Sequence, residues 1–251
     1  MLLIGMHISR SAHMTTKRIP LTLIGAAILL ALAPPVQAQA VPIGLFPTGV
    51  DANGFARLDG ANELHYDLIA APAPMPPGIP IVNTGPGFPV SPGGPWLTDS
   101  PVTGSPCDAP TSRWIAPTLV DVLPNGIPTI HPLGSYTYRT TFDLTGFDPA
   151  TAVIAGCWAA DNEGFNILIN SAPTAQGAVG FAAWTPFTVA AGFLLPTLND
   201  LDFQVFNNTG PTGLRVVFTE GTAQRLVAEP LSLALVGMAL TGLGMFRRRL
   251  V

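Results

Sequence analysis

The amino-acid sequence predicts an all-β protein whose central domain is an antiparallel β-sandwich. Charged residues make up only 10% of the 251 residues, whereas glycine (26) and proline (27) are abundant. This composition favours short strands joined by turns over a helical bundle. No long segment with the 3.6-residue period of an amphipathic helix occurs outside the two ends of the chain. We therefore expect one sandwich domain over residues 41–226.

Alternation of apolar and polar residues predicts the individual strands. Tyr136, Tyr138 and Phe142 lie on one face of an extended segment and Arg139 lies on the other, which is typical of a half-buried strand. A nearly continuous apolar run is instead typical of a central strand. The strands predicted in this way are residues 136–144, 152–158, 165–170, 201–205 and 214–219. The proline- and glycine-rich residues 71–110 are expected to run as extended surface chain.

The amino-terminal residues have the order of a secretory signal. Lys17 and Arg18 precede the apolar residues 19–33, and the small residues Ala38 and Ala40 follow. This pattern predicts a signal helix within residues 1–40 and cleavage after Ala40 by signal peptidase. Because a signal counted from Met14 has ordinary length, we expect Met14 to be the true start. The partners implied are the secretion machinery and signal peptidase.

The carboxyl-terminal residues predict a membrane anchor. The apolar residues 231–246 end at three consecutive cations, Arg247, Arg248 and Arg249. Sixteen helical residues cover about 24 Å, against a hydrocarbon core of about 30 Å, and flanking residues can supply the difference. The arginines then lie on the cytoplasmic side, which leaves the body of the protein outside. The alternative is a terminal helix buried within the domain.

Residues 227–251 resemble the PEP-CTERM sorting signal of proteins exported by Gram-negative bacteria. Glu229 and Pro230 stand directly before the apolar segment, and the arginine cluster closes the chain. The usual form is Val-Pro-Glu-Pro, and Ala228 departs from it. The resemblance implies that Glu229 and Pro230 are recognised by an exosortase-like membrane protease. It also implies an inner-membrane anchor before processing, and the cell surface or extracellular matrix afterwards.

Several blocks in the body resemble a jelly-roll module related to galactose-binding-like and carbohydrate-binding domains. These blocks are Tyr136–Leu144, Trp158–Asn162, Trp184–Phe187 and Gly210–Arg215. The resemblance implies a jelly-roll-like sandwich. In many modules of this shape it also implies glycan binding, although a shared fold does not establish a shared ligand.

The charge of the body argues against nucleic acid as a partner. Residues 41–230 carry all 15 acidic residues and five arginines, a net charge of −10, whereas phosphate contacts need clustered cations. Exopolysaccharide is a more suitable partner, because sugars stack on aromatic faces and bond to amides and charged groups. The residues expected to contact a glycan are Trp96, Trp114, Trp184, Asn162 and Arg215. Packing of the tryptophans in the sandwich interior is the alternative.

Two cysteines and few histidines limit the remaining chemistry. Cys107 and Cys157 are expected to form a disulfide in an exported protein, with two unpaired thiols as the alternative. Only His65 and His131 fall within residues 41–226, and no hydrolase, metalloprotease or phosphate-loop motif occurs.

We therefore predict a non-enzymatic protein, without cofactor or metal, associated with exopolysaccharide or biofilm matrix. One alternative is an exported glycan-active hydrolase that uses carboxylates such as Asp161 and Glu163. In the simpler interpretation, these two residues only form a turn, without binding calcium. The other alternative is a purely structural surface protein without ligand.

Overall fold

The computed structural model describes residues 40–83, 96–97, 107, 111–120, 129–189, 194–226 and 237. Between residues 40 and 226 the described part contains strands and no helix. The strands are β1 (Ala40–Pro42), β2 (Asp67–Ala70), β3 (Ile81–Asn83), β4 (Trp114–Ala116), β5 (Gly134–Asp143), β6 (Phe147–Asp161), β7 (Glu163–Ile169), β8 (Ala172–Pro173), β9 (Thr185–Val189), β10 (Leu198–Asn207) and β11 (Gly213–Arg225).

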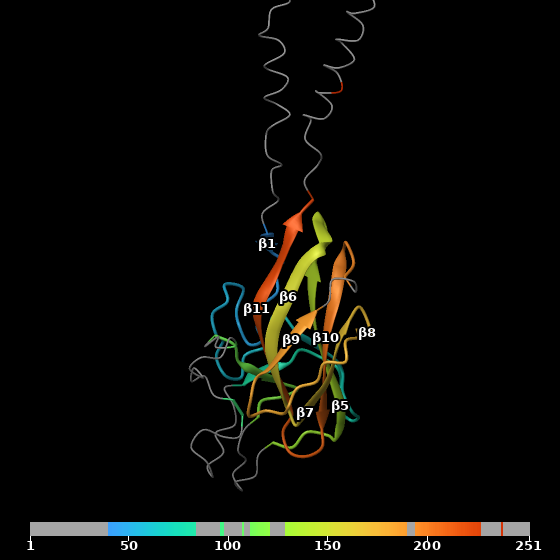
Figure 1. Ribbon diagram of the computed structural model, residues 1–251. Coiled ribbons are helices and arrows are strands. Elements are labelled where there is room, and N and C mark those ends of the chain that lie inside the picture. Colours follow the sequence, from blue (N-terminus) through green and yellow to red (C-terminus); the bar gives the residue numbers. More distant parts are fainter. Residues whose placement is uncertain are drawn as a thin grey trace, which may run out of the picture. The chain divides into compact units, whose positions relative to one another are not determined.

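The strands form two antiparallel sheets (Figure 1). Sheet I has the order β3-β4-β11-β6-β9, with β1 paired to β11, and sheet II has the order β2-β5-β10-β7-β8. Long pairings hold each sheet together. β6 and β11 pair along most of their length in sheet I, and β5 and β10 pair from Leu198 opposite Asp143 to Asn207 opposite Gly134 in sheet II. The all-β, antiparallel prediction is therefore confirmed for the described residues.

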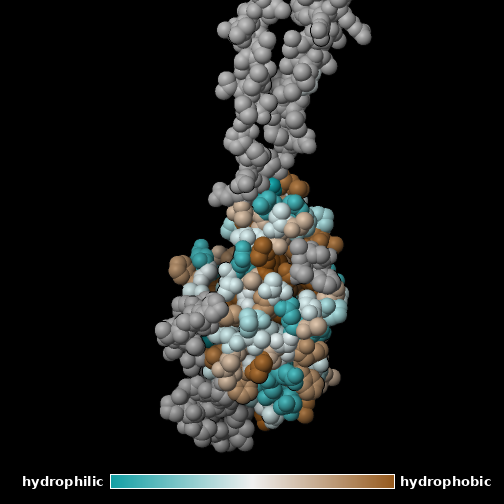
Figure 2. Space-filling view, in the orientation of Figure 1, coloured by the Kyte–Doolittle hydropathy of each residue, from teal (hydrophilic) through white to brown (hydrophobic). Residues whose placement is uncertain are grey.

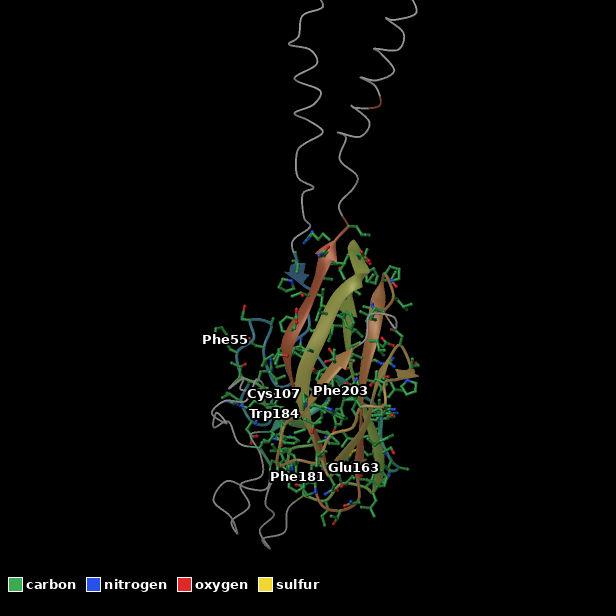
Figure 3. All side chains as sticks on the ribbon, viewed as in Figure 1. Phe55, Cys107, Glu163, Phe181, Trp184 and Phe203 are labelled. Atoms are coloured by element: carbon green, nitrogen blue, oxygen red, sulfur yellow. A yellow bond between two sulfur atoms is a disulfide. The ribbon has the colours of Figure 1, made fainter. Side chains whose placement is uncertain are left out.

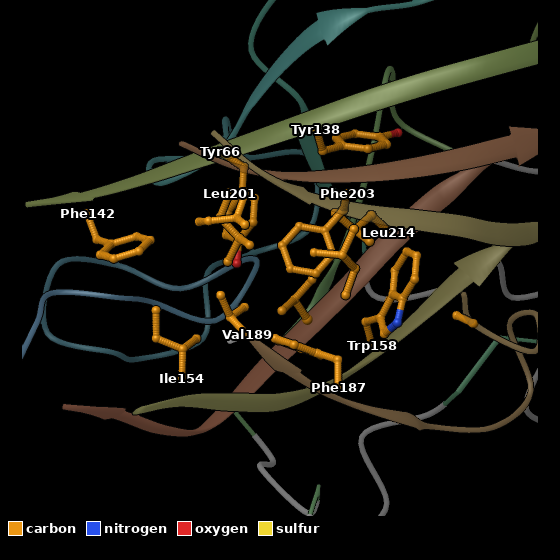
Figure 4. Close-up of a cluster of buried hydrophobic side chains, with 14 of the residues drawn as sticks. Tyr66, Tyr138, Phe142, Ile154, Trp158, Phe187, Val189, Leu201, Phe203 and Leu214 are labelled. Carbon is orange, nitrogen blue, oxygen red and sulfur yellow. The ribbon is translucent and has the colours of Figure 1, made fainter. Parts of the chain in front are cut away.

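The core lies between the inner faces of the two sheets, as in a β-sandwich. Phe203 of sheet II packs against Trp158 and Phe187 of sheet I, with ring centroids 5.5 and 5.7 Å apart (Figure 4). Tyr138 and Ile167, which flank Phe203 on the neighbouring strands, are fully buried. Burial of a large apolar side chain contributes about 1.5–3 kcal/mol, so this aromatic centre is a main source of stability.

All five strands predicted by alternation are present, with different limits. β6 and β11 are the most extended relative to the prediction, because alternation fades toward their ends while backbone pairing continues. The expectation of surface chain throughout residues 71–110 is wrong for some of its described residues. Val82, Trp96 and Cys107 are buried, since β3 joins sheet I and the two other residues pack on that sheet.

Several predictions concern residues outside the described part. The signal segment before Ala40, the sorting residues Glu229 and Pro230, the apolar residues 231–246 and the arginine cluster belong to this group. Ala40 is described, and it pairs with Gln224 at the start of β1. Among the described residues, no helix is long and apolar enough to cross a membrane.

Candidate functional site

The outer face of sheet I is covered, and most of the residues expected to contact a glycan lie there. Along β6, Trp158 and Ala160 face the core between the sheets, so Ala159 faces outward. Trp96 and Trp114 pack over Ala159 with their ring centroids 4.5 Å apart, and they are only 2% and 1% exposed. Their rings therefore form a second, smaller core on the outer face of sheet I, outside the sandwich interior in which the alternative placed them.

Arg215 is buried on the same face and bonds to Leu97 and Ser112. Its guanidinium donates to the backbone oxygen of Leu97 at 2.9 Å and to the backbone oxygen of Ser112 at 2.8 Å. Its Nε donates to the Ser112 hydroxyl at 3.0 Å, and its charge lies 5.3 Å from the ring centroid of Trp184. Because Arg215 is 2% exposed and bonded to backbone, it holds the covering segments against the sheet.

The predicted disulfide between Cys107 and Cys157 is confirmed. The two Cα atoms are 5.7 Å apart and the residues are 50 positions apart in the sequence. Both half-cystines are buried beside Val217, with Trp184 packed against them (Figure 3). The bridge therefore joins Cys107 covalently to β6 of sheet I.

The turn at Asp161 and Asn162 is engaged within the protein. The amide oxygen of Asn162 accepts backbone N–H groups of Asn208 at 2.9 Å and Thr209 at 3.1 Å. The indole of Trp96 donates to Asp161 Oδ2 at 2.6 Å, whereas Oδ1 has no partner in the described part of the chain. Burial raises the pKa of Asp161 to about 7, against the lowering effect of the Trp96 hydrogen bond.

Among the described residues, neither histidine is hydrogen-bonded to a serine or cysteine side chain. His131 is buried, with Nδ1 accepting the Thr212 N–H at 3.0 Å and Nε2 2.9 Å from the Thr118 hydroxyl. Burial lowers the pKa of His131 to about 4, so the ring is neutral. His65 stacks on Phe46. The described residues also contain no group of three or more His, Cys, Asp and Glu side chains suited to a metal ion.

The outer face of sheet II differs, because polar side chains occupy it. Tyr136, Tyr138 and Phe203 face the core, so the residues between them in β5 and β10 face outward. We call eight outward residues of the three middle strands the polar face; Leu168 of β7 also faces outward and is not among them. They are Thr137, Arg139 and Thr141 of β5, Asp200, Asp202, Gln204 and Phe206 of β10, and Asn166 of β7.

A charged triad fixes the middle of the polar face. Arg139 Nε and one terminal nitrogen donate to Asp202 at 2.7 and 2.8 Å, and the other terminal nitrogen lies 2.8 Å from Asp200. The hydrogen bonds that Arg139 donates to Asp202 are the main cause that raises the pKa of Arg139. This bidentate contact with the buried carboxylate of Asp202 sets the orientation of the guanidinium, whereas the pair with the partly exposed Asp200 adds little stability.

An amide row and two aromatic side chains lie next to the triad. Gln204 pairs with Thr137 on one side and Asn166 on the other, and no hydrogen bond of its side chain occurs among the described residues. A bulge at this point makes Phe165 the extra residue of β7, and Phe165 is 43% exposed. Phe206, the next outward residue of β10, is 39% exposed. The exposed phenylalanine rings thus lie near the Gln204 amide, whereas the side-chain oxygen of Asn166 is buried and has no hydrogen-bond partner among the described residues.

The sequence analysis did not select the polar face. It recognised Arg139 as facing away from the core, but the tryptophans were the stronger aromatic signal. The available signal was the polar side of two predicted strands, at Thr137 and Gln204, together with the exposed phenylalanines.

Comparisons of the chain with known protein families, with curated proteins and with solved structures find no match.

Proposed function

We propose that this protein is an exported, non-enzymatic, jelly-roll-like β-sandwich that binds extracellular polysaccharide through the polar face of sheet II. The observation that carries the proposal is the row of Thr137, Gln204 and Asn166 beside the exposed ring of Phe206. Sugar rings present both hydroxyl groups and apolar C–H faces. They therefore fit amides, hydroxyls and an aromatic ring held in one plane.

The surroundings of the row also support a polysaccharide ligand. The charge of Arg139 is balanced by Asp200 and Asp202, so the face has no free cation among its described side chains to attract phosphate groups. A sheet positions side chains more firmly than a loop does, which lowers the entropy lost on binding. On the side of the molecule seen in Figure 2, hydrophilic and hydrophobic residues are interspersed.

The proposed location rests on the two ends of the sequence. A signal ending at Ala40 directs export, and residues 231–246 with Arg247 to Arg249 hold the protein in the inner membrane. An exosortase-like protease then recognises Glu229 and Pro230 and releases the protein to the cell surface or matrix. A Glu229→Ala, Pro230→Ala variant tests this step. We expect it to accumulate unprocessed, and normal processing would exclude these residues as the recognition element.

A glycan array tests the binding function. The full chain, purified in detergent, is compared with a Gln204→Ala, Phe206→Ala variant and with Phe55→Ala. Phe55 is an exposed phenylalanine in a loop, outside the polar face, and serves as the matched control (Figure 3). We expect the double variant to bind at least about tenfold more weakly, which is about 1.4 kcal/mol, and Phe55→Ala to bind normally.

Two further measurements make the result decisive. Urea unfolding checks that the double variant keeps its stability within about 0.5 kcal/mol, as expected for surface substitutions. A reducing-sugar assay on each bound glycan checks for turnover. Release of sugar that a carboxylate variant abolishes would favour the hydrolase alternative. The absence of all glycan binding would leave the purely structural role.

A further inference from the structure

A cavity of about 440 Å³ opens beside β2, at the edge of sheet II. Its lining includes Phe46, Glu63, His65, Asp67, Ile79 and Thr141. The volume lies within the range of small-ligand sites, about 300–1,000 Å³. The cavity adjoins the polar face, because Thr141 belongs to both and Asp67 pairs with Arg139 across β2 and β5.

Glu63 lines this cavity, and both oxygens of its carboxylate accept hydrogen bonds from backbone N–H groups. Its Oε2 accepts the Gly49 N–H at 2.7 Å, and its Oε1 accepts the N–H groups of Leu64 and His65 at 3.0 and 2.9 Å. Burial is the largest influence on the Glu63 carboxyl and raises its pKa, while these hydrogen bonds oppose that shift. The buried carboxyl therefore fixes the backbone that carries His65 and Asp67.

The side chains of His65 and Asp67 keep unused acceptor atoms. The His65 ring stacks on Phe46 at 4.0 Å between centroids, with an angle of 6° between the planes. Its Nε2 lies 3.3 Å from the backbone oxygen of Asp51, and a carbonyl only accepts, so Nε2 carries the hydrogen. In the neutral tautomer with the hydrogen on Nε2, Nδ1 is an acceptor. Neither Nδ1 nor the exposed Asp67 carboxylate has a hydrogen-bond or ion-pair partner among the described residues.

The cavity is rich in acceptors and has no lysine or arginine in its lining. Arg139, the strand neighbour of Asp67, is already engaged by Asp200 and Asp202. Ile79, which is 55% exposed, supplies an apolar wall. A complementary ligand therefore brings hydrogen-bond donors, preferably a positive charge, and one apolar face. A carboxylate-bearing sugar would instead meet unbalanced negative charge.

We propose that this cavity binds an amine-bearing sugar residue of the polysaccharide. The proposal rests on the function proposed for the polar face and deepens it by naming the ligand class. The ammonium group bonds to the Asp67 carboxylate, the His65 Nδ1 accepts a hydroxyl or ammonium hydrogen, and the sugar ring packs on Ile79. Neighbouring sugar residues extend along Thr141 toward the amide row.

The test compares three probes on the full chain in detergent. They are a glucosamine oligosaccharide, its N-acetylated counterpart and an oligosaccharide of uronic acid, each titrated by calorimetry. We expect the glucosamine oligosaccharide to bind at least about tenfold more tightly than the N-acetylated one, and the uronate to bind most weakly. Equal affinity for the first two probes, or preference for the uronate, would overturn the proposal.

An Asp67→Asn variant identifies the site. It keeps the size and shape of the side chain and removes the charge, so we expect it to lose the preference for glucosamine and to bind the glucosamine and N-acetylated probes with similar affinity. Glu220→Gln is the control, since Glu220 is exposed on β11 of the other sheet.

If Asp67→Asn keeps the preference for glucosamine, the cavity does not bind the amine. If the polar-face variant still loses glycan binding in that case, the proposed function stands without this cavity. If the wild-type chain binds none of the probes and no glycan of the array, the proposed function and the cavity proposal both fall.

Discussion

The two sheets use the same kinds of residue on their outer faces in opposite ways. On sheet I, Arg215 lies 2% exposed beneath segments that carry Trp96 and Cys107. On sheet II, the side chain of Arg139 is 29% exposed and contacts two carboxylates, the partly exposed Asp200 and the buried Asp202. A buried arginine with backbone partners stabilises the fold, whereas a surface arginine with carboxylate partners orients side chains. Burial and partners, rather than residue type, therefore distinguish the structural face from the proposed binding face.

The largest expected effect on stability comes from removing the disulfide on the outer face of sheet I. Replacing both Cys107 and Cys157 by serine removes a bridge across a 50-residue separation. The chain-entropy model gives about 4 kcal/mol for a loop of this length, and measured losses are often smaller. We expect the free energy of unfolding to fall by about 2–4 kcal/mol in urea. Glycan binding by the polar face should persist under conditions in which the variant is folded.

Reduction of the wild-type protein provides the matching control. Dithiothreitol should lower its stability toward that of the double variant and should leave the double variant unchanged. A double variant as stable as the oxidised wild type would show that hydrophobic packing and the Arg215 contacts alone hold the covering segment on sheet I.

Substitution of Arg215 or Arg139 is expected to have the next largest effect on the free energy of unfolding. In Arg215→Met, the backbone oxygens of Leu97 and Ser112 lose buried donors, and we expect a loss of about 2–4 kcal/mol in unfolding free energy. In Arg139→Met, the exposed side of Asp200 stays hydrated, but the buried carboxylate of Asp202 loses its partner, and we expect about 1–3 kcal/mol.

In glycan affinity we expect the opposite order, with the larger loss in Arg139→Met. Arg139→Met loosens the polar face and should weaken binding, whereas Arg215→Met should leave the affinity of the folded protein unchanged. Equal losses of stability in the two variants would contradict the distinction between the two faces.

The sequence predicted the parts of the molecule that depend on local pattern. Alternation located β5, β7 and β10, and the export context predicted the Cys107–Cys157 bridge. The burial of Trp96 was not predictable in this way, because residues 71–110 have no strand period that shows which face they cover. A proline-rich composition indicates irregular chain, and it gives no information on contacts with distant strands.

The candidate site depended on long-range register. Gln204 lies between Thr137 and Asn166 only because β10 pairs with β5 and β7, which come from residues more than thirty positions away. The bulge that exposes Phe165 is likewise a property of the pairing between two strands. Local periodicity indicates which side of a strand is polar. It does not indicate which polar residues of different strands become neighbours.

The smallest expected effect is a change in the pH dependence of stability on the covered side. The pKa of Asp161 is raised from an ordinary 3.8 to about 7, so its contribution to folding is complete below pH 4 and is lost as the pH rises to 7. The pKa of His131 is lowered from 6.5 to about 4, so its contribution is complete above pH 6.5 and is lost as the pH falls to 4. The two therefore oppose each other between pH 4 and 6.5, and Glu63 adds to the direction of Asp161.

Asp161→Asn separates these contributions, because asparagine resembles the protonated carboxyl and does not titrate. We expect the unfolding free energy of the variant to rise with pH between 4 and 6.5 by about 0.5–1 kcal/mol per pH unit more steeply than that of the wild type. The variant should also be the more stable protein at pH 7, where the wild type begins to carry a buried charge beside Trp96. Urea unfolding at several pH values measures both, with Glu220→Gln as the exposed control. Identical slopes in the variant and the wild type would show that Asp161 does not titrate in this range, and that the indole hydrogen bond outweighs burial on the covered face of sheet I.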